Sequence, residues 1–139
     1  MNSFTLDDIS VGLTQSFVTS VTADMLGKFL QISGDTNPLH VDLDYAQSKG
    51  FKDKVVYGLL TSAFYSTLAG VYLPGKYCIL QGLDISFTKP VFVGDTLTVT
   101  GKVSYINEAY KQLEIKAVIT NQDGVKVSKA KIKTGLIDA

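Results

Sequence analysis

Hydrophobic residues in the second half of the chain fall into runs that are rich in Val, Ile, Leu, Thr and Tyr. This composition is typical of strands, particularly where apolar and polar residues alternate, as they do around Val127, Ala130 and Ile132. Four strands are predicted, at Tyr77 to Thr88, Thr96 to Ile106, Gln112 to Thr120 and Val125 to Leu136. The turn-forming run Asn121-Gln122-Asp123-Gly124 predicts a hairpin between the last two.

The first half of the chain has a different pattern. Gln15 to Val21 predicts a first strand, and Thr22 predicts the cap of a helix over Ala23 to Ile32. A short helix around Asp42 to Ser48, ended by Gly50, is predicted next. The apolar positions that set the period of the first helix are Met25, Leu26, Phe29 and Leu30.

The longest predicted helix runs from Gly58 to Leu73 and contains no charged residue. Its apolar face is predicted at Leu60, Phe64, Leu68 and Val71, with Thr61, Ser62 and Ser66 on other faces. The uncharged stretch around it, between Lys54 and Lys76, is long enough to span a bilayer, but its many hydroxyl groups favour a helix buried in protein. A helix of this kind beside antiparallel strands predicts an α+β fold in which the sheet wraps the helix.

Length and charge restrict the possible functions. The 139 residues fit a single domain, 1–139, and 13 basic residues balance 13 acidic ones, so binding to nucleic acid or to a membrane surface is not expected. A local group of lysines alternates with apolar residues, which predicts the water-exposed face of a strand rather than a binding patch. These lysines are Lys126, Lys129, Lys131 and Lys133.

Cysteine and histidine are scarce. A single cysteine, Cys78, excludes an intrachain disulfide and fits a reducing compartment. With only one histidine as well, the chain cannot furnish a Cys/His zinc site, and no metal is predicted. The first twelve residues do not resemble a signal peptide, and the last residues show no peroxisomal address, so a cytoplasmic location is expected.

The candidate chemistry lies in the loop Ser33-Gly34-Asp35-Thr36-Asn37-Pro38-Leu39-His40. It places an acid, Asp35, five residues before the only histidine, His40. A carboxylate and an imidazole held together can position a water molecule and share its proton, as addition to a polarised double bond requires. Pro38 stiffens the loop, and Gly34 lets its backbone turn. Such residues are also common in ordinary turns, so the loop alone leaves both interpretations open.

This loop resembles the signature Gly-Asp-x-Asn-Pro-Leu/Ile/Val-His of the MaoC-like, or (R)-specific enoyl-CoA hydratase, family. The resemblance continues through Val56-Tyr57-Gly58-Leu59-Leu60, Phe87-Thr88-Lys89-Pro90-Val91 and Gly94-Asp95-Thr96-Leu97, with further matches at Asp42, Tyr45, Ala46 and Phe51. It implies a hot-dog fold, in which an antiparallel sheet wraps a long central helix. It also implies reversible hydration of trans-2-enoyl-CoA to (R)-3-hydroxyacyl-CoA.

The family's site residues are carried over by position. Asp35 and His40 are the expected catalytic pair, and the backbone N–H of Gly58 is the expected donor to the thioester oxygen. A helix N-terminus suits that task because its N–H groups are free and its dipole favours an anion. Asn37 either orients the pair or the substrate, or only shapes the turn. Tyr57, Tyr65, Ser62 and Ser66 either line the pocket or pack in the core.

No separate cofactor is expected, since hydration transfers no electrons and coenzyme A is part of the substrate. The family usually forms homodimers or larger homo-oligomers. A first alternative is a (3R)-hydroxyacyl-acyl-carrier-protein dehydratase, which uses the same chemistry in reverse. A thioesterase is a second alternative, and a non-catalytic acyl-thioester-binding protein is a third. The intact motif argues against the last two.

Overall fold

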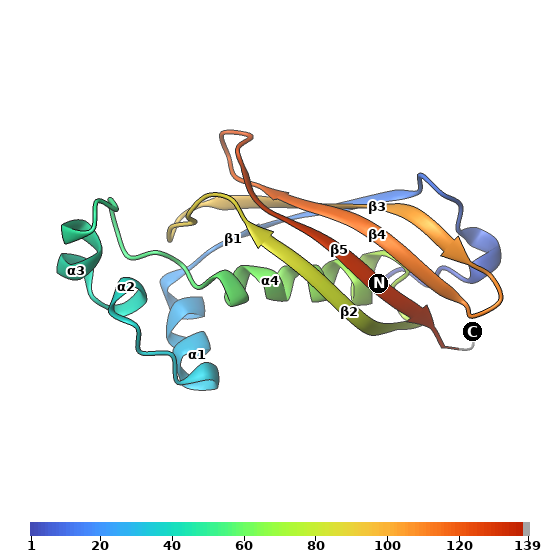
Figure 1. Cartoon of the computed structure of the whole chain (residues 1–139), viewed down its shortest axis with the longest axis horizontal. Helices are drawn as coiled ribbons and strands as arrows, with labels where there is room; N and C mark the ends of the chain where they lie inside the picture. The colour runs from blue at the N-terminus through green and yellow to red at the C-terminus, as the bar shows by residue number, and fades with distance from the viewer. Residues whose placement is uncertain (138–139) are drawn as a thin grey trace.

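The computed structural model describes residues 1–137 and contains one antiparallel sheet (Figure 1). The strand order is β1-β3-β4-β5-β2, so β1 and β2 form the two edges. The strands are β1 (Thr14–Ser20), β2 (Cys78–Phe87), β3 (Thr96–Asn107), β4 (Gln112–Thr120) and β5 (Lys126–Leu136). The five predicted strands are therefore confirmed, with ends that differ by at most one residue.

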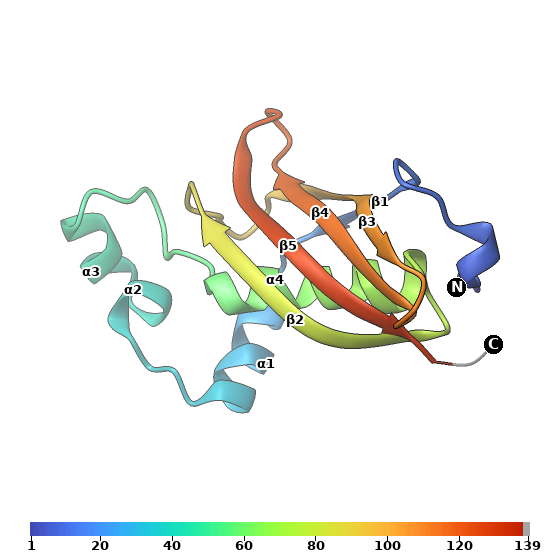
Figure 2. The same ribbon diagram turned by 45° about the vertical axis from the view of Figure 1, so that its right-hand side comes forward.

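The sheet curves around the helix α4 (Gly58–Thr67), as Figure 2 shows. Beyond Thr67 the helix continues as a short π-helical segment, η2 (Leu68–Tyr72). Together they confirm the predicted long helix and the α+β architecture of a hot-dog fold. Among residues 1–137, no helix is long and apolar enough to cross a membrane.

The face of α4 that packs against the sheet differs in part from the predicted one. Thr61, Ser62 and Tyr65 are buried in α4, and Leu68 and Ala69 are buried in η2. Leu60 and Phe64 are only partly buried, and Leu59 is 67% exposed. Small hydroxyl side chains let the helix approach the sheet closely, so the sheet covers one side of the helix and leaves the other uncovered.

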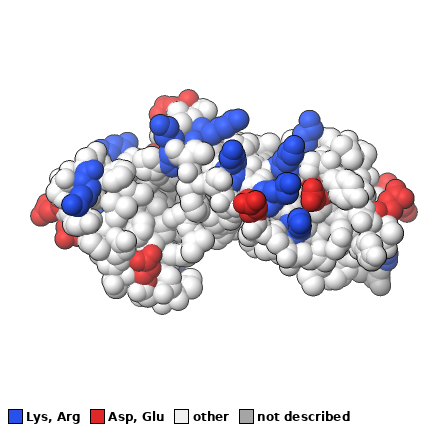
Figure 3. All heavy atoms as spheres, in the orientation of Figure 1, with Lys and Arg blue, Asp and Glu red and all other residues white. Residues whose placement is uncertain are grey.

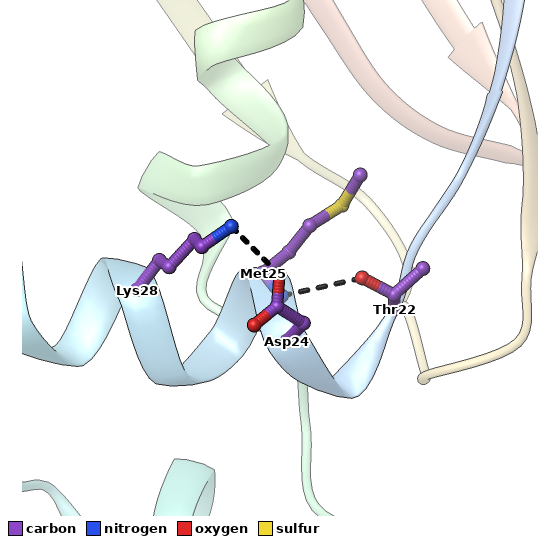
Figure 4. Close-up of polar contacts among 4 residues, drawn as sticks. All are labelled: Thr22, Asp24, Met25 and Lys28. Atoms are coloured by element: carbon purple, nitrogen blue, oxygen red, sulfur yellow. Dashed lines mark hydrogen bonds and ion pairs between the residues drawn. The ribbon is translucent and has the colours of Figure 1, made fainter.

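The first helix, α1 (Ala23–Ser33), begins as the sequence predicts. The Thr22 hydroxyl accepts a hydrogen bond from the Met25 N–H at 3.2 Å, and Lys28 pairs with Asp24 one turn later at 2.8 Å (Figure 4). The cap supplies an acceptor to an N–H that has no partner within the helix. The ion pair is exposed, so it contributes little to stability.

Two short helices follow α1. The predicted helix after the loop is α3 (Leu43–Ser48), which is capped by the Asp42 carboxylate as it accepts a hydrogen bond from the Tyr45 N–H at 3.1 Å. The segment before it, predicted as loop, forms a single helical turn, α2 (Pro38–Val41), with Pro38 at the first position and His40 within it. Proline favours this position because its fixed φ suits a helix start and its missing N–H leaves no donor unpaired.

Cys78 lies half-buried at the start of the edge strand β2. Burial raises the pKa of its thiol to about 11, because the thiolate is poorly solvated there. The neutral thiol therefore favours the folded state up to pH 9, and this contribution is lost as the pH rises through 11.

We expect the Cys78 thiol of the folded protein to react slowly with a disulfide reagent at pH 8, and rapidly once the protein is unfolded. A disulfide reagent that releases a coloured thiol on reaction is used. The absorbance of that thiol, followed with and without denaturant, measures both rates. A stoichiometric reaction of the folded protein within seconds at pH 8 would contradict the assigned burial.

Candidate active site

A cavity of about 610 Å³ opens beside the start of α4. Its wall includes the end of α1, the loop that follows it, the segment 51–59, the turn after β2 and Val127 of β5. Three residues predicted to act in the reaction, Asp35, His40 and Gly58, all line this cavity. The structure thus brings together, from three different elements, the acid, the imidazole and the helix N-terminus.

Side-chain hydrogen bonds to the backbone fix the loop that carries Asp35. The Ser33 hydroxyl accepts from the Asp35 N–H at 3.1 Å, and the Asp35 Oδ1 accepts from the Asn37 N–H at 3.0 Å. Such turns are what Ser, Asp and Asn favour. Among the described residues no hydrogen bond reaches the Asp35 Oδ2, so this oxygen can accept one from a ligand.

A backbone carbonyl sets the tautomer of His40. The His40 Nδ1 lies 2.6 Å from the carbonyl oxygen of Val55, and the Val55 N–H donates to the carbonyl of Leu39 at 3.1 Å. A carbonyl can only accept, so Nδ1 carries the hydrogen. In the neutral ring, Nε2 then holds the lone pair that can take a proton from water.

Tyr57 connects the two halves of the site. Its hydroxyl donates to the backbone carbonyl of Asp35 at 2.8 Å, and its ring lies 4.2 Å from the His40 ring, centroid to centroid. Burial, and to a lesser degree the charge of Asp35, raises the pKa of Tyr57, so the hydroxyl keeps the proton that it donates. The same side chain therefore restrains the Asp35 loop and one side of the imidazole.

Gly58 is the first residue of α4, so its N–H has no acceptor within the helix. The hydroxyls of Thr61 and Ser62 both donate to the Gly58 carbonyl at 2.8 Å, which fixes the first turn. A Cβ atom at position 58 would lie 2.9 Å from the ring of Phe87. Glycine thus permits the close approach of Phe87, which also lines the cavity.

The other predicted candidates have different positions. Ser62 and Tyr65 are buried, and Tyr65 bonds to the Ser128 hydroxyl at 2.9 Å, so both pack in the core. Ser66 is exposed. Asn37 is not among the residues that line the cavity, and its Oδ1 caps α2 by accepting from the Leu39 N–H at 3.0 Å. This contact fits the turn-shaping role, and a role of Asn37 toward substrate stays a prediction.

The two roles left open for Asn37 can be separated by two variants. We expect Asn37→Ala to cost about 1 kcal/mol of stability through the lost cap, and to lower kcat as His40 loses its support. Asn37→Asp keeps the capping oxygen and is expected to restore both properties. Thermal unfolding and turnover measure them. If Asn37→Asp lost as much turnover as Asn37→Ala, the amide N–H groups would be needed, as binding to substrate requires.

Other contacts at this site were not predicted from the sequence. The carbonyl of Val55 is a backbone group, so residue type carries no signal for it. Phe29 lies against Tyr57, with the ring centroids 4.7 Å apart, although its spacing predicted only a helix core position. Among residues 1–137, no three His, Cys, Asp or Glu side chains gather in a way that could hold a metal ion.

The geometry supports acid–base chemistry on a bound water. The open lone pairs of Asp35 and His40 line a largely apolar cavity, and a free N–H group lies at the same wall. This combination can orient water, move its proton and stabilise an oxyanion. The same three groups, Asp35, His40 and the Gly58 N–H, are those expected from the sequence motif.

Known proteins provide an independent comparison. Residues 11–127 match the family described as MaoC like domain. An (R)-specific enoyl-CoA hydratase of Rhodospirillum rubrum is 37% identical over 98 residues, which are 70% of this chain and 68% of that protein. The enzyme of the same name from Aeromonas caviae is 41% identical over 80 residues, 58% of this chain and 60% of its own length.

Among solved structures, an (R)-hydratase from A. caviae involved in PHA biosynthesis superposes with a TM-score of 0.88 at 31% identity. The superposition covers 93% of this chain and 98% of the other. The family match spans far more than half of the chain, and the structural likeness extends over nearly all of it. The chain therefore belongs to the MaoC-like dehydratase family.

Proposed function

We propose that this protein is a hydro-lyase that reversibly adds water to trans-2-enoyl-CoA and forms (R)-3-hydroxyacyl-CoA. The observation that carries the proposal is the placement of Asp35 and His40 on the wall of one cavity, with the imidazole Nε2 left as a proton acceptor. The hydratases named above, at 37% and 41% identity, support the same reaction.

In the proposed reaction, the Asp35 Oδ2 and the His40 Nε2 accept hydrogen bonds from one water molecule. As the water oxygen bonds to C3 of the enoyl group, its proton passes to the pair and the C2–C3 π electrons move toward the thioester oxygen. A proton then returns to C2, so one water has been added in total. The two groups act as a coupled unit, without separate assignments of acid and base.

The thioester oxygen gains negative charge while C2 is unprotonated. We propose that the Gly58 N–H donates to this oxygen, because it is the first free donor of α4 and lines the same cavity. A donor held in place before the reaction requires no reorganisation when the charge develops. The Cβ-free position also lets the thioester come close to the backbone.

Coenzyme A belongs to the substrate in this proposal, and no other cofactor takes part in the reaction. The single cysteine is consistent with a reducing location such as the cytoplasm. The same active-site chemistry would serve a carrier-protein thioester, because the carrier lies outside the reacting atoms.

The test is the loss of the ultraviolet absorption of the conjugated thioester when the protein is mixed with crotonyl-CoA. We expect turnover, and we expect chiral analysis of the product to give the (R)-3-hydroxy isomer. A protein that hydrates no enoyl-CoA of any chain length, and no smaller enoyl thioester, would contradict the proposed function. An (S) product would retain hydration but contradict the assigned stereochemistry.

We further propose that a second copy of the chain covers the uncovered side of α4. Leu59 of α4 is 67% exposed and Phe87 of β2 is 53% exposed, and both line the cavity. Leu80 and Leu83 lie on the same inner face of the edge strand β2, opposite the buried Thr134 and Ile132. An apolar surface beside an unpaired strand edge is typical of a protein interface. Sedimentation is expected to give at least the mass of a dimer.

A further inference from the structure

Lysine side chains gather on the outer face of the sheet, the side away from α4. Lys102 of β3, Lys116 of β4 and Lys131 of β5 stand directly opposite one another across three neighbouring strands. Lys129 and Lys133 flank Lys131 on the same face of β5. We call these five residues the lysine face; Figure 3 shows lysines over this sheet, with acidic groups among them. The acids that the register places there are Asp84 and Glu114.

The lysine face is not neutralised within the chain. Five lysines face two acids, a local excess of three positive charges in a chain with no net charge. Within residues 1–137, no hydrogen bond or ion pair is formed by the ammonium groups of these five lysines. Like charges directly opposite one another on adjacent strands destabilise a sheet. The arrangement therefore has a cost that folding alone does not explain.

One end of the lysine face lies close in sequence and register to residues that line the cavity. Lys129 lies opposite Ser86, whose neighbour Phe87 lines the cavity. Just beyond, the Thr88 hydroxyl donates to the carbonyl of Lys126, and the cavity-lining Lys89 lies beside Val127 through a backbone hydrogen bond. Together with Lys126 at the start of β5, outside the lysine face itself, the lysines along this strand extend over about 23 Å, at ~3.3 Å per residue. This length suits a macromolecule better than one nucleotide.

We propose that the lysine face docks an acidic carrier protein that presents the acyl thioester to the cavity. The proposal rests on the proposed function, since it names a second source for the same substrate group. A partner that delivers a substrate must sit beside the mouth, whereas a membrane or a nucleic acid has no reason to be there. The interspersed Asp84 and Glu114 also repel a uniform anion but suit a protein surface of mixed charge.

The experiment compares crotonyl thioesters of pantetheine, of coenzyme A and of an acyl carrier protein. The readout is the kcat/KM for the carrier-protein thioester divided by that for the pantetheine thioester. We expect Lys116→Glu to lower this ratio about 10-fold at low salt, and added salt to lower the ratio of the wild type toward that of the variant. Lys76→Glu has the same charge change away from the lysine face and is expected to keep the ratio.

Stability separates docking from damage to the fold. In Lys116→Glu a carboxylate lies between Lys102 and Lys131, so we expect the Tm to rise by about 2–4 °C while the ratio falls. The proposal would be overturned if Lys116→Glu left this kcat/KM ratio unchanged. It would also be overturned if the wild-type protein did not favour the carrier-protein thioester over the pantetheine thioester. If Lys116→Glu lowered kcat/KM for the coenzyme A thioester as much as for the carrier-protein thioester, the lysine face would instead bind the nucleotide part of coenzyme A. Failure to hydrate even the pantetheine thioester would refute the proposed function itself.

Discussion

Replacing His40 by Gln, or Asp35 by Asn, is expected to lower kcat/KM for hydration of crotonyl-CoA by about 10²–10⁴. Each change keeps the size of the side chain but removes a group that can exchange a proton. In His40→Gln the side-chain amide can still donate to the Val55 carbonyl, so the position is conserved while the Nε2 lone pair is lost. In Asp35→Asn the amide oxygen can still accept from the Asn37 N–H.

Because the two groups share one proton, the double variant is expected to lose little more than either single variant. Asp44→Asn is a suitable control, since it removes a carboxylate from the exposed first turn of α3, away from the residues that line the cavity. Initial rates with crotonyl-CoA measure all four variants. If either single variant retained more than a tenth of the wild-type rate, its residue would not be part of the catalytic pair.

The second large effect is expected at Gly58, where a backbone donor can be removed by proline. Gly58→Pro eliminates the N–H and is expected to lower kcat by about 10²–10³. Proline is tolerated at the first position of a helix. The preceding residue, Tyr57, has φ −55° and ψ 126°, an extended conformation that a following proline accepts.

Gly58→Ala is the matched control, because it adds a side-chain carbon but keeps the N–H. That carbon would press on the ring of Phe87 at 2.9 Å, and the contacted atoms are at the far end of the side chain and can move aside, so a loss of only a few-fold is expected. Circular dichroism and thermal unfolding check that both variants are folded. Equal losses in the two variants would show that space at position 58 matters, and would remove the role proposed for its N–H.

Local signals predicted most of the fold. Thr22 before an apolar-periodic run placed the start of α1, and the Asn121–Gly124 turn placed the β4–β5 hairpin, because these residues act through their immediate neighbours. The predicted buried face of α4 was partly wrong for the opposite reason. Its periodicity reports hydrophobicity, whereas the side facing the sheet is chosen by close packing, which favours Thr61 and Ser62 over the predicted Leu60 and Phe64.

Only those residues of the candidate site that belong to the sequence motif were predicted. The spacing of Asp35 and His40 carried that signal, and both line the cavity. The contacts that hold them come from Val55 and Tyr57, some 15–22 residues away along the chain. The lysine face depends on strand register, which places Lys102 and Lys116 beside Lys131. The alternation of polar and apolar residues in the sequence indicated only the lysines of β5.

The bond between His40 and the carbonyl of Val55 has a practical consequence for altering this protein. A side-chain substitution scan cannot delete a backbone acceptor, so the imidazole tautomer is protected from mutation at position 55. The Val55 side chain, in contrast, forms part of the cavity wall. Larger or smaller apolar residues at this position can therefore reshape the cavity while the proton on Nδ1 stays in place. Under the proposed function, position 55 is accordingly a favourable site for libraries that aim to change the preferred length of the acyl chain.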